Sequence, residues 1–159
     1  MSYTPLETKL REMMQADPVL PTLVTNGFFD LQLPQGLTNK TPPITAMTVQ
    51  RVSTQRMSMH SGPSGAVTNI TPLALVRIQF TAWCTGPSSN SAALAVLNAL
   101  VNFLNTFDAT STREFGSPPL AALHFPSQIL DERVTLYAPT QPPIYTGILD
   151  ARLYNREDL

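Results

Sequence analysis

The stretch LVRIQFTAWC, residues 75–84, alternates between two kinds of side chain. One set is apolar or small and comprises Val76, Ile78, Phe80, Ala82 and Cys84. The other set is more polar and comprises Leu75, Arg77, Gln79, Thr81 and Trp83. A period of two is typical of a strand, so the stretch predicts a strand with one core face and one partly hydrated face.

Arg77 is the only Asp, Glu, Lys or Arg within residues 57–107. An arginine on a strand in such a charge-poor region requires a carboxylate partner. Asp150 and Glu132, which lie on other strands or at their ends, are the best candidates. We expect the pair to form within one subunit in preference to across a subunit interface.

A turn follows the strand, and then NSAALAVLNALVNFLNTF, residues 90–107, predicts a helix with Ser89, Asn90 or Ser91 as its N-cap. Two apolar stripes run along it, Leu94, Leu97, Val101 and Leu104, and Val96, Leu100, Phe103 and Phe107. A helix that is apolar over more than half its circumference is buried on two sides, inside its own subunit or partly against a neighbour. It is too short and too rich in asparagine to span a membrane.

The N-terminal region predicts two helices. In TPLE, Thr4 fits an N-cap, and the side chain of Glu7 is expected to accept a hydrogen bond from the free amide of Thr4. Asp17-Pro18 is expected to end this helix. DPVLPTLV, residues 17–24, predicts a short second helix.

The other segments predict strands and loops. Strands are expected over residues 44–53 and 143–155, with a further strand over 118–130 that is interrupted near Pro126. Residues 28–43 are expected to be mostly loop with one short extended piece, and residues 54–72 a long hairpin loop. The predicted fold is α+β, one domain over residues 1–159: a mainly antiparallel sheet of about four strands, with an N-terminal helix and a long central helix packed on it.

The composition limits the classes of partner. The net charge is −1 and no run of like charges occurs, so free nucleic acid is not an expected ligand. Charged residues make up 13% of the chain, whereas about 25% is typical, and the surface is therefore rich in neutral polar groups that are cheap to desolvate. This composition favours extensive contacts in an assembly. A single cysteine and the lack of a signal segment indicate the cytosol.

Candidate catalytic groups are few. Cys84 with His60 or His124 is the only thiol and base combination, but Cys84 belongs to the apolar set, where a thiolate is disfavoured. The histidines and the cysteine lack metal-ligand spacing, and no nucleotide motif occurs, so we expect no metal, no cofactor and no enzymatic activity. Met57 and Met59, next to His60, are a candidate adaptable contact patch.

RIQFTAWC, followed by a turn and NSAALAVLNALVNFL, resembles the core of the phage tail-completion, or tail-terminator, family. Members pair an Arg-x-Gln-x-x-x-Trp strand with an Ala-x-x-Leu-x-x-x-Val-x-x-x-Leu helix. The matching residues here are Arg77, Gln79, Trp83, Leu97, Val101 and Leu104. The similarity extends to ADPVLPTLV, to LPQGLTNKTPPITAMTVQRVS and to DERVTLYAPTQPPIYTGILDARLYN.

The resemblance implies a structural virion protein that assembles in the host cytoplasm into a ring, commonly a hexamer. Such a ring caps the tail tube, ends its elongation and joins it to the head-side connector or stopper protein. The family has no catalytic motif to transfer. Another neck component, such as a connector stopper, and a small thiol hydrolase using Cys84 and His124 are the alternatives. The candidate subunit or partner interface comprises Arg77, Gln79, Trp83, Met57, Met59 and His60.

Overall fold

The computed structural model describes residues 6–30, 32–34, 36–37, 43–57, 73–109, 128–139 and 143–156. Its elements, in chain order, are α1 (Leu6–Gln15), α2 (Leu20–Leu23), β1 (Phe28–Asp30), β2 (Ile44–Met57), β3 (Leu73–Thr85), α3 (Ser89–Ala109), β4 (Gln128–Ala138) and β5 (Ile144–Arg156).

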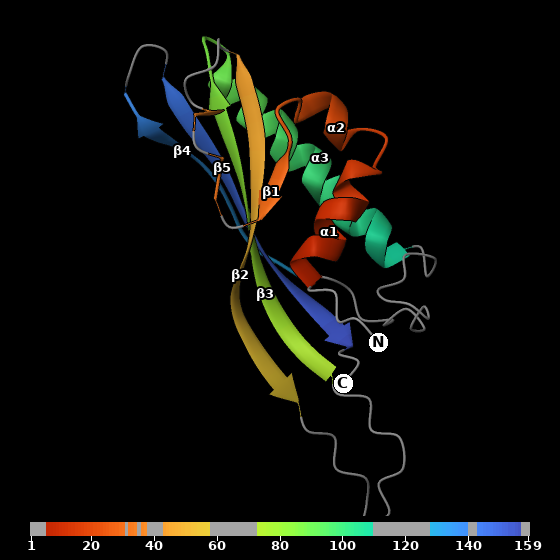
Figure 1. The fold of residues 1–159 in the computed structure, drawn as a ribbon. Helices are drawn as coiled ribbons and strands as arrows, with labels where there is room; N and C mark the ends of the chain where they lie inside the picture. The colour runs from red at the N-terminus through yellow and green to blue at the C-terminus, as the bar shows by residue number, and fades with distance from the viewer. Residues whose placement is uncertain are drawn as a thin grey trace, which may run out of the picture.

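The strands form one sheet in the order β1-β2-β3-β5-β4, and only the β1–β2 pair is parallel. All three helices lie on one side of this sheet (Figure 1). The predicted α+β fold is therefore confirmed, with five strands in place of about four. The additional strand is β1, which corresponds to the short extended piece expected within residues 28–43.

The helix-covered face holds the core. In β3 the predicted apolar set, Val76, Ile78, Phe80, Ala82 and Cys84, is at most 1% exposed. The neighbouring strand β5 adds Leu149, Ala151 and Leu153 to the same cluster. The alternation predicted for β3 is confirmed, because its apolar set faces the helices and its more polar set faces the other side of the sheet.

Helix α3 is buried on two sides, by the sheet and by α2. Val96, Leu97, Leu100, Phe103 and Leu104 are each at most 4% exposed. Leu94, predicted to lie in one of the apolar stripes, is 48% exposed in the single chain, so burial inside its own subunit is excluded for it and only burial against a neighbour stays a prediction. At Gly147 of β5 the helix comes so close that a Cβ atom would lie 3.1 Å from Leu97 Cγ and 3.2 Å from the Ala93 carbonyl oxygen.

Helix α1 is attached to the sheet by ion pairs. Arg51 of β2 donates from Nε to Glu7 Oε1 at 2.6 Å and from Nη2 to Glu7 Oε2 at 3.2 Å. Glu7 was predicted to cap its own helix through Thr4, but both of its oxygens accept from Arg51, and Thr4 lies outside the described residues. Arg11 also pairs with Asp30 of β1 at 3.0 Å.

Two strand predictions require correction. Residues 54–57 belong to β2 and not to the hairpin loop, since they pair with β3 up to Met57↔Leu73. The strand expected over 118–130 is found at Gln128–Ala138, and residues 118–127 lie outside the described part of the chain. In both cases cross-strand pairing extends regular structure into charged or polar positions, such as Asp131–Arg133 of β4 and Gln55 of β2. The ends of β2 and β3 consequently extend beyond the helical layer (Figure 1).

Candidate interaction surface

The sheet face opposite the helices, here called the open face, carries the hydrated residues of β3. Gln79 lies between Gln50 of β2 and Asp150 of β5, and Thr81 lies between Thr48 and Ile148. No helix of the described chain covers this face (Figure 1). Its centre is formed by short neutral side chains that their neighbours nearly bury: Thr48 at 5%, Thr81 at 9% and Thr146 at 3% exposure.

Arg77 forms a polar cluster with Asp150 and Gln79 on the open face. Arg77 Nη2 donates to Asp150 Oδ2 at 3.1 Å, and Gln79 Nε2 donates to Asp150 Oδ1 at 3.2 Å. Asp150 is 3% exposed, so both carboxylate oxygens need these donors. The prediction of an intramolecular partner for Arg77 is confirmed. The Arg77 side chain itself remains 46% exposed and accessible to another molecule.

Trp83 is held toward the other end of the open face by contacts with two further strands. Its Nε1 donates to Thr48 Oγ1 at 3.1 Å. Its ring meets Tyr137 of β4 edge to face, with centroids 5.1 Å apart and planes at 81°. These contacts satisfy the indole N–H and fix the orientation of the ring.

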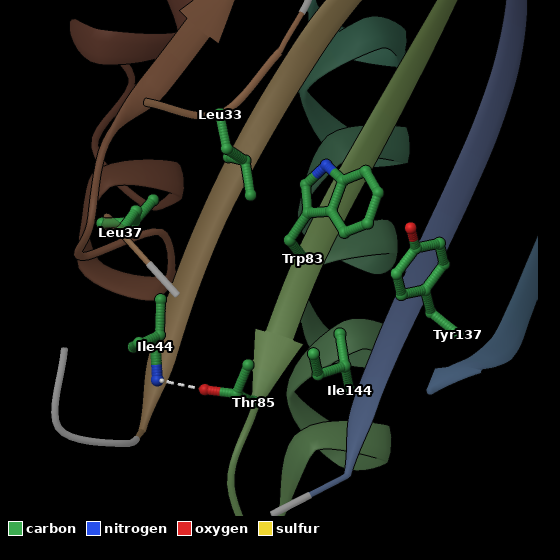
Figure 2. Close-up of a pocket in the computed structure, with 7 residues that line it drawn as sticks. All are labelled: Leu33, Leu37, Ile44, Trp83, Thr85, Tyr137 and Ile144. Atoms are coloured by element: carbon green, nitrogen blue, oxygen red, sulfur yellow. Dashed lines mark hydrogen bonds between the residues drawn. The ribbon is translucent and has the colours of Figure 1, made fainter. Parts of the chain in front are cut away.

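Beside Trp83 lies a small apolar pocket of about 150 Å³ (Figure 2). Its lining comes from segments far apart in the sequence: Leu33, Leu37, Ile44, Trp83, Thr85, Tyr137 and Ile144. The Thr85 hydroxyl already accepts from the Ile44 amide at 3.2 Å, so the walls offer little to a polar ligand. A pocket of this size and lining admits one apolar side chain or a ring the size of benzene.

Only part of the predicted interface set comes together. Arg77, Gln79 and Trp83 share the open face, whereas Met57 ends β2, at the opposite end of that strand from Ala46, the partner of Trp83. Met59 and His60 lie outside the described residues. Sequence reasoning missed Tyr137, Leu33 and Leu37, because the first lay beyond the expected strand and the others lay in a segment interpreted as loop. The aromatic residue at the end of an alternating run, VTLY, was the available signal for Tyr137.

Cys84 lies on the opposite, helix-covered face. It is fully buried, and burial raises the pKa of its thiol from 9.0 to about 11, although a hydrogen bond with Thr45 opposes this shift. Such a thiol is almost wholly protonated at neutral pH and is a poor nucleophile. Its suggested base, His124, lies outside the described residues. Within the ranges that the structure describes, no three potential metal ligands converge.

A comparison with protein-family models and one with curated proteins found no match to this chain. Among the described helices, none has the length and apolar character needed to cross a membrane.

Proposed function

We propose that this protein is a ring-forming structural subunit of a phage tail, which caps the tail tube, ends its elongation and provides the joint to the head-side connector. The observation that carries the proposal is the position of the motif residues. Arg77, Gln79 and Trp83 lie together on a helix-free sheet face, while Leu97 and Leu104 of the motif helix are buried behind it. This division leaves one broad surface of the subunit available for assembly.

The chemistry of that surface suits an assembly contact. It presents the half-exposed Arg77, which is paired with Asp150, the partly exposed neutral side chain of Gln79 and one apolar pocket. Neutral groups cost much less to desolvate than unpaired charges. Asp150 already has its donors, so the subunit can present this face inside an assembly without leaving a carboxylate unpaired. A ring built in this way binds a matching ring through repeated weak contacts, whose avidity replaces any single strong site.

The β2–β3 hairpin is the proposed contact to the tube or the connector. Both strands extend beyond the helical layer and carry residues 58–72 between them, a segment outside the described residues (Figure 1). A projecting hairpin reaches along the ring axis without disturbing contacts around the ring. Deleting Ser61 to Gly65 should therefore leave rings intact and impair joining, whereas normal joining by the deletion variant would exclude this role.

The alternatives differ in their support. A thiol hydrolase needs an accessible thiolate, and the buried Cys84 with a pKa of about 11 does not supply one. A connector stopper would use the same surfaces, so an assay, and not the geometry of the subunit, must distinguish a stopper from a tail terminator.

The test uses purified protein and growing tail tubes. We expect negative-stain images with a central hole, a native mass several times the 17.4 kDa of one chain, and tubes that stop elongating when the protein is added. Binding to the connector without any effect on tube length would identify a stopper. A compact monomer that neither forms rings nor binds tubes would contradict both readings.

A further inference from the structure

Two edges of the sheet lack a neighbouring strand within the described chain. β4 pairs with β5 on one side only, over Gln128–Ala138. On the other edge β1 pairs with Met47–Val49 of β2, and no described strand lies beside Gln50–Met57. Edge backbone of this length is a ready template for another strand.

We infer that adjacent copies join edge to edge, β4 of one copy pairing with Gln50–Met57 of the next, so that the ring contains one continuous sheet. The inference rests on the proposed ring and specifies its interface. β2 and β5 both run antiparallel to β3, and β4 runs antiparallel to β5. Strand β4 placed beside the next copy's β2 therefore continues the antiparallel alternation without a break.

The side chains on the two edges favour this pairing over other occupants. Three of the five large hydrophobic residues that the described chain exposes lie on these edges: Val52 at 47%, Leu136 at 48% and Tyr137 at 63%. The middle of β4 carries Asp131, Glu132 and Arg133, whereas residues 52–55 of β2 are uncharged. Their pairing creates no like-charge contact, while two β4 edges in contact would place the same charged stretch against itself.

The offset between the edges matches the geometry of a closed sheet. Arg133, in the middle of β4, is level with Ile148, Thr81 and Thr48, but the middle of the open stretch of β2 is level with Arg77. Pairing the edges moves each copy along the strand direction by about four residues, roughly 14 Å, relative to the copy before it. The four strands β2, β3, β5 and β4 of one copy together span roughly 19 Å across the strand direction. That shift corresponds to a strand tilt of about 36°, and closed sheets have tilts of about 35–45°.

The direction of the offset selects the face that lines the opening. Crossovers between parallel strands are right-handed. Seen from the helices with β3 pointing up, a right-handed β3–α3–β4 crossover places β4 at the upper right and the open stretch of β2 at the lower left. Each copy on the right is then displaced upward along the strands relative to its left neighbour. When such copies close into a ring, the upper ends of the strands tilt to the right relative to the ring axis. The right-handed twist of strands gives a closed sheet this same rightward tilt when the sheet is viewed from outside the ring. The helices therefore lie outside, and the open face with Arg77 lines the opening.

Cysteine cross-linking of the full chain tests the interface. Ser53 and Arg133 both lie on the open face, and we combine Ser53→Cys with Arg133→Cys or with Thr135→Cys to cover two registers. Mild oxidation should produce a ladder of covalent multimers from a double variant and only monomers from each single variant; buried Cys84 does not interfere. Covalent dimers from Arg133→Cys alone would show β4–β4 pairing and overturn the inference.

A charged substitution gives an independent readout. Val52→Lys should shift the native mass from ring to folded monomer, whereas Val19→Lys, a matched change at a 51% exposed position in the described chain, should leave rings intact. Suppose that rings form, that Val52→Lys does not disperse them and that no cysteine pair cross-links them. Edge pairing is then wrong and the ring proposal stands. If the wild-type protein never assembles, both proposals are wrong.

Discussion

The guanidinium of Arg77 donates to the carboxylate of Asp150 across two neighbouring strands, at 3.1 Å. The arginine is half exposed, but the carboxylate is almost completely buried and depends on its donors. The energetic importance of this pair therefore lies in satisfying Asp150 and not in a surface charge contact.

Arg77→Ala should lower the free energy of unfolding by about 1–3 kcal/mol, because a buried carboxylate loses a charged donor. Arg133→Ala is the matched control, since its pair with Asp131 is exposed on both sides and should contribute no more than about 1 kcal/mol. Urea unfolding of the monomer measures both values. Unchanged monomer stability with dispersed rings would instead assign Arg77 to an interface between subunits.

Glu7→Ala should destabilise the protein by about 1.5–3 kcal/mol, because Arg51 loses a partly buried, bidentate partner. Glu12→Ala, an exposed glutamate on the same helix, should change stability by less than about 0.5 kcal/mol. A double-mutant cycle with Arg51→Ala isolates the coupling between the two side chains. Additive effects in that cycle would contradict a direct contribution from the pair.

Gly147→Ala should cost about 1–3 kcal/mol, since its Cβ would meet Leu97 and the Ala93 carbonyl oxygen and push α3 away from β5. The measurement is urea unfolding. Ala151→Gly, on the same face of β5, is the control that measures how an exchange between alanine and glycine in this strand changes stability by itself. In the Leu97→Ala background the additional cost of Gly147→Ala should decrease, because one of its two close contacts is removed. An equal cost in both backgrounds would contradict this packing.

Cys84 should make stability depend on pH only in the alkaline range. The folded-state pKa of about 11 lies above the ordinary value of 9.0, so the unfolded chain ionises first as the pH rises. The stability of the wild type relative to Cys84→Ala should be constant below pH 9 and fall between pH 9 and 11. The same variant should still form rings. A difference that grew below pH 8 would contradict the buried, protonated thiol.

Strands β2, β3 and β5, the helices and the core face of β3 followed from sequence patterns, because burial of one face imposes a period of two or near 3.6 on local sequence. Strand β4 did not, since only residues 128–130 of it fell within the expected range. The alternation around Arg77 predicted both faces of β3 and a carboxylate partner. Leu94 shows the limit of such patterns, since a residue at helical spacing is buried only when another element reaches it, and none of the described elements covers it.

Tertiary structure alone decided the strand order, the Glu7–Arg51 pair and the pocket between Leu33, Trp83 and Tyr137. These features join residues that are distant in the chain, and no local spacing encodes which distant segments meet. The two unpaired edges and their offset arise in the same way, from the lengths of strands after pairing. The sequence by itself determined which face of β3 is buried, and the sheet decided what remains open for a neighbour.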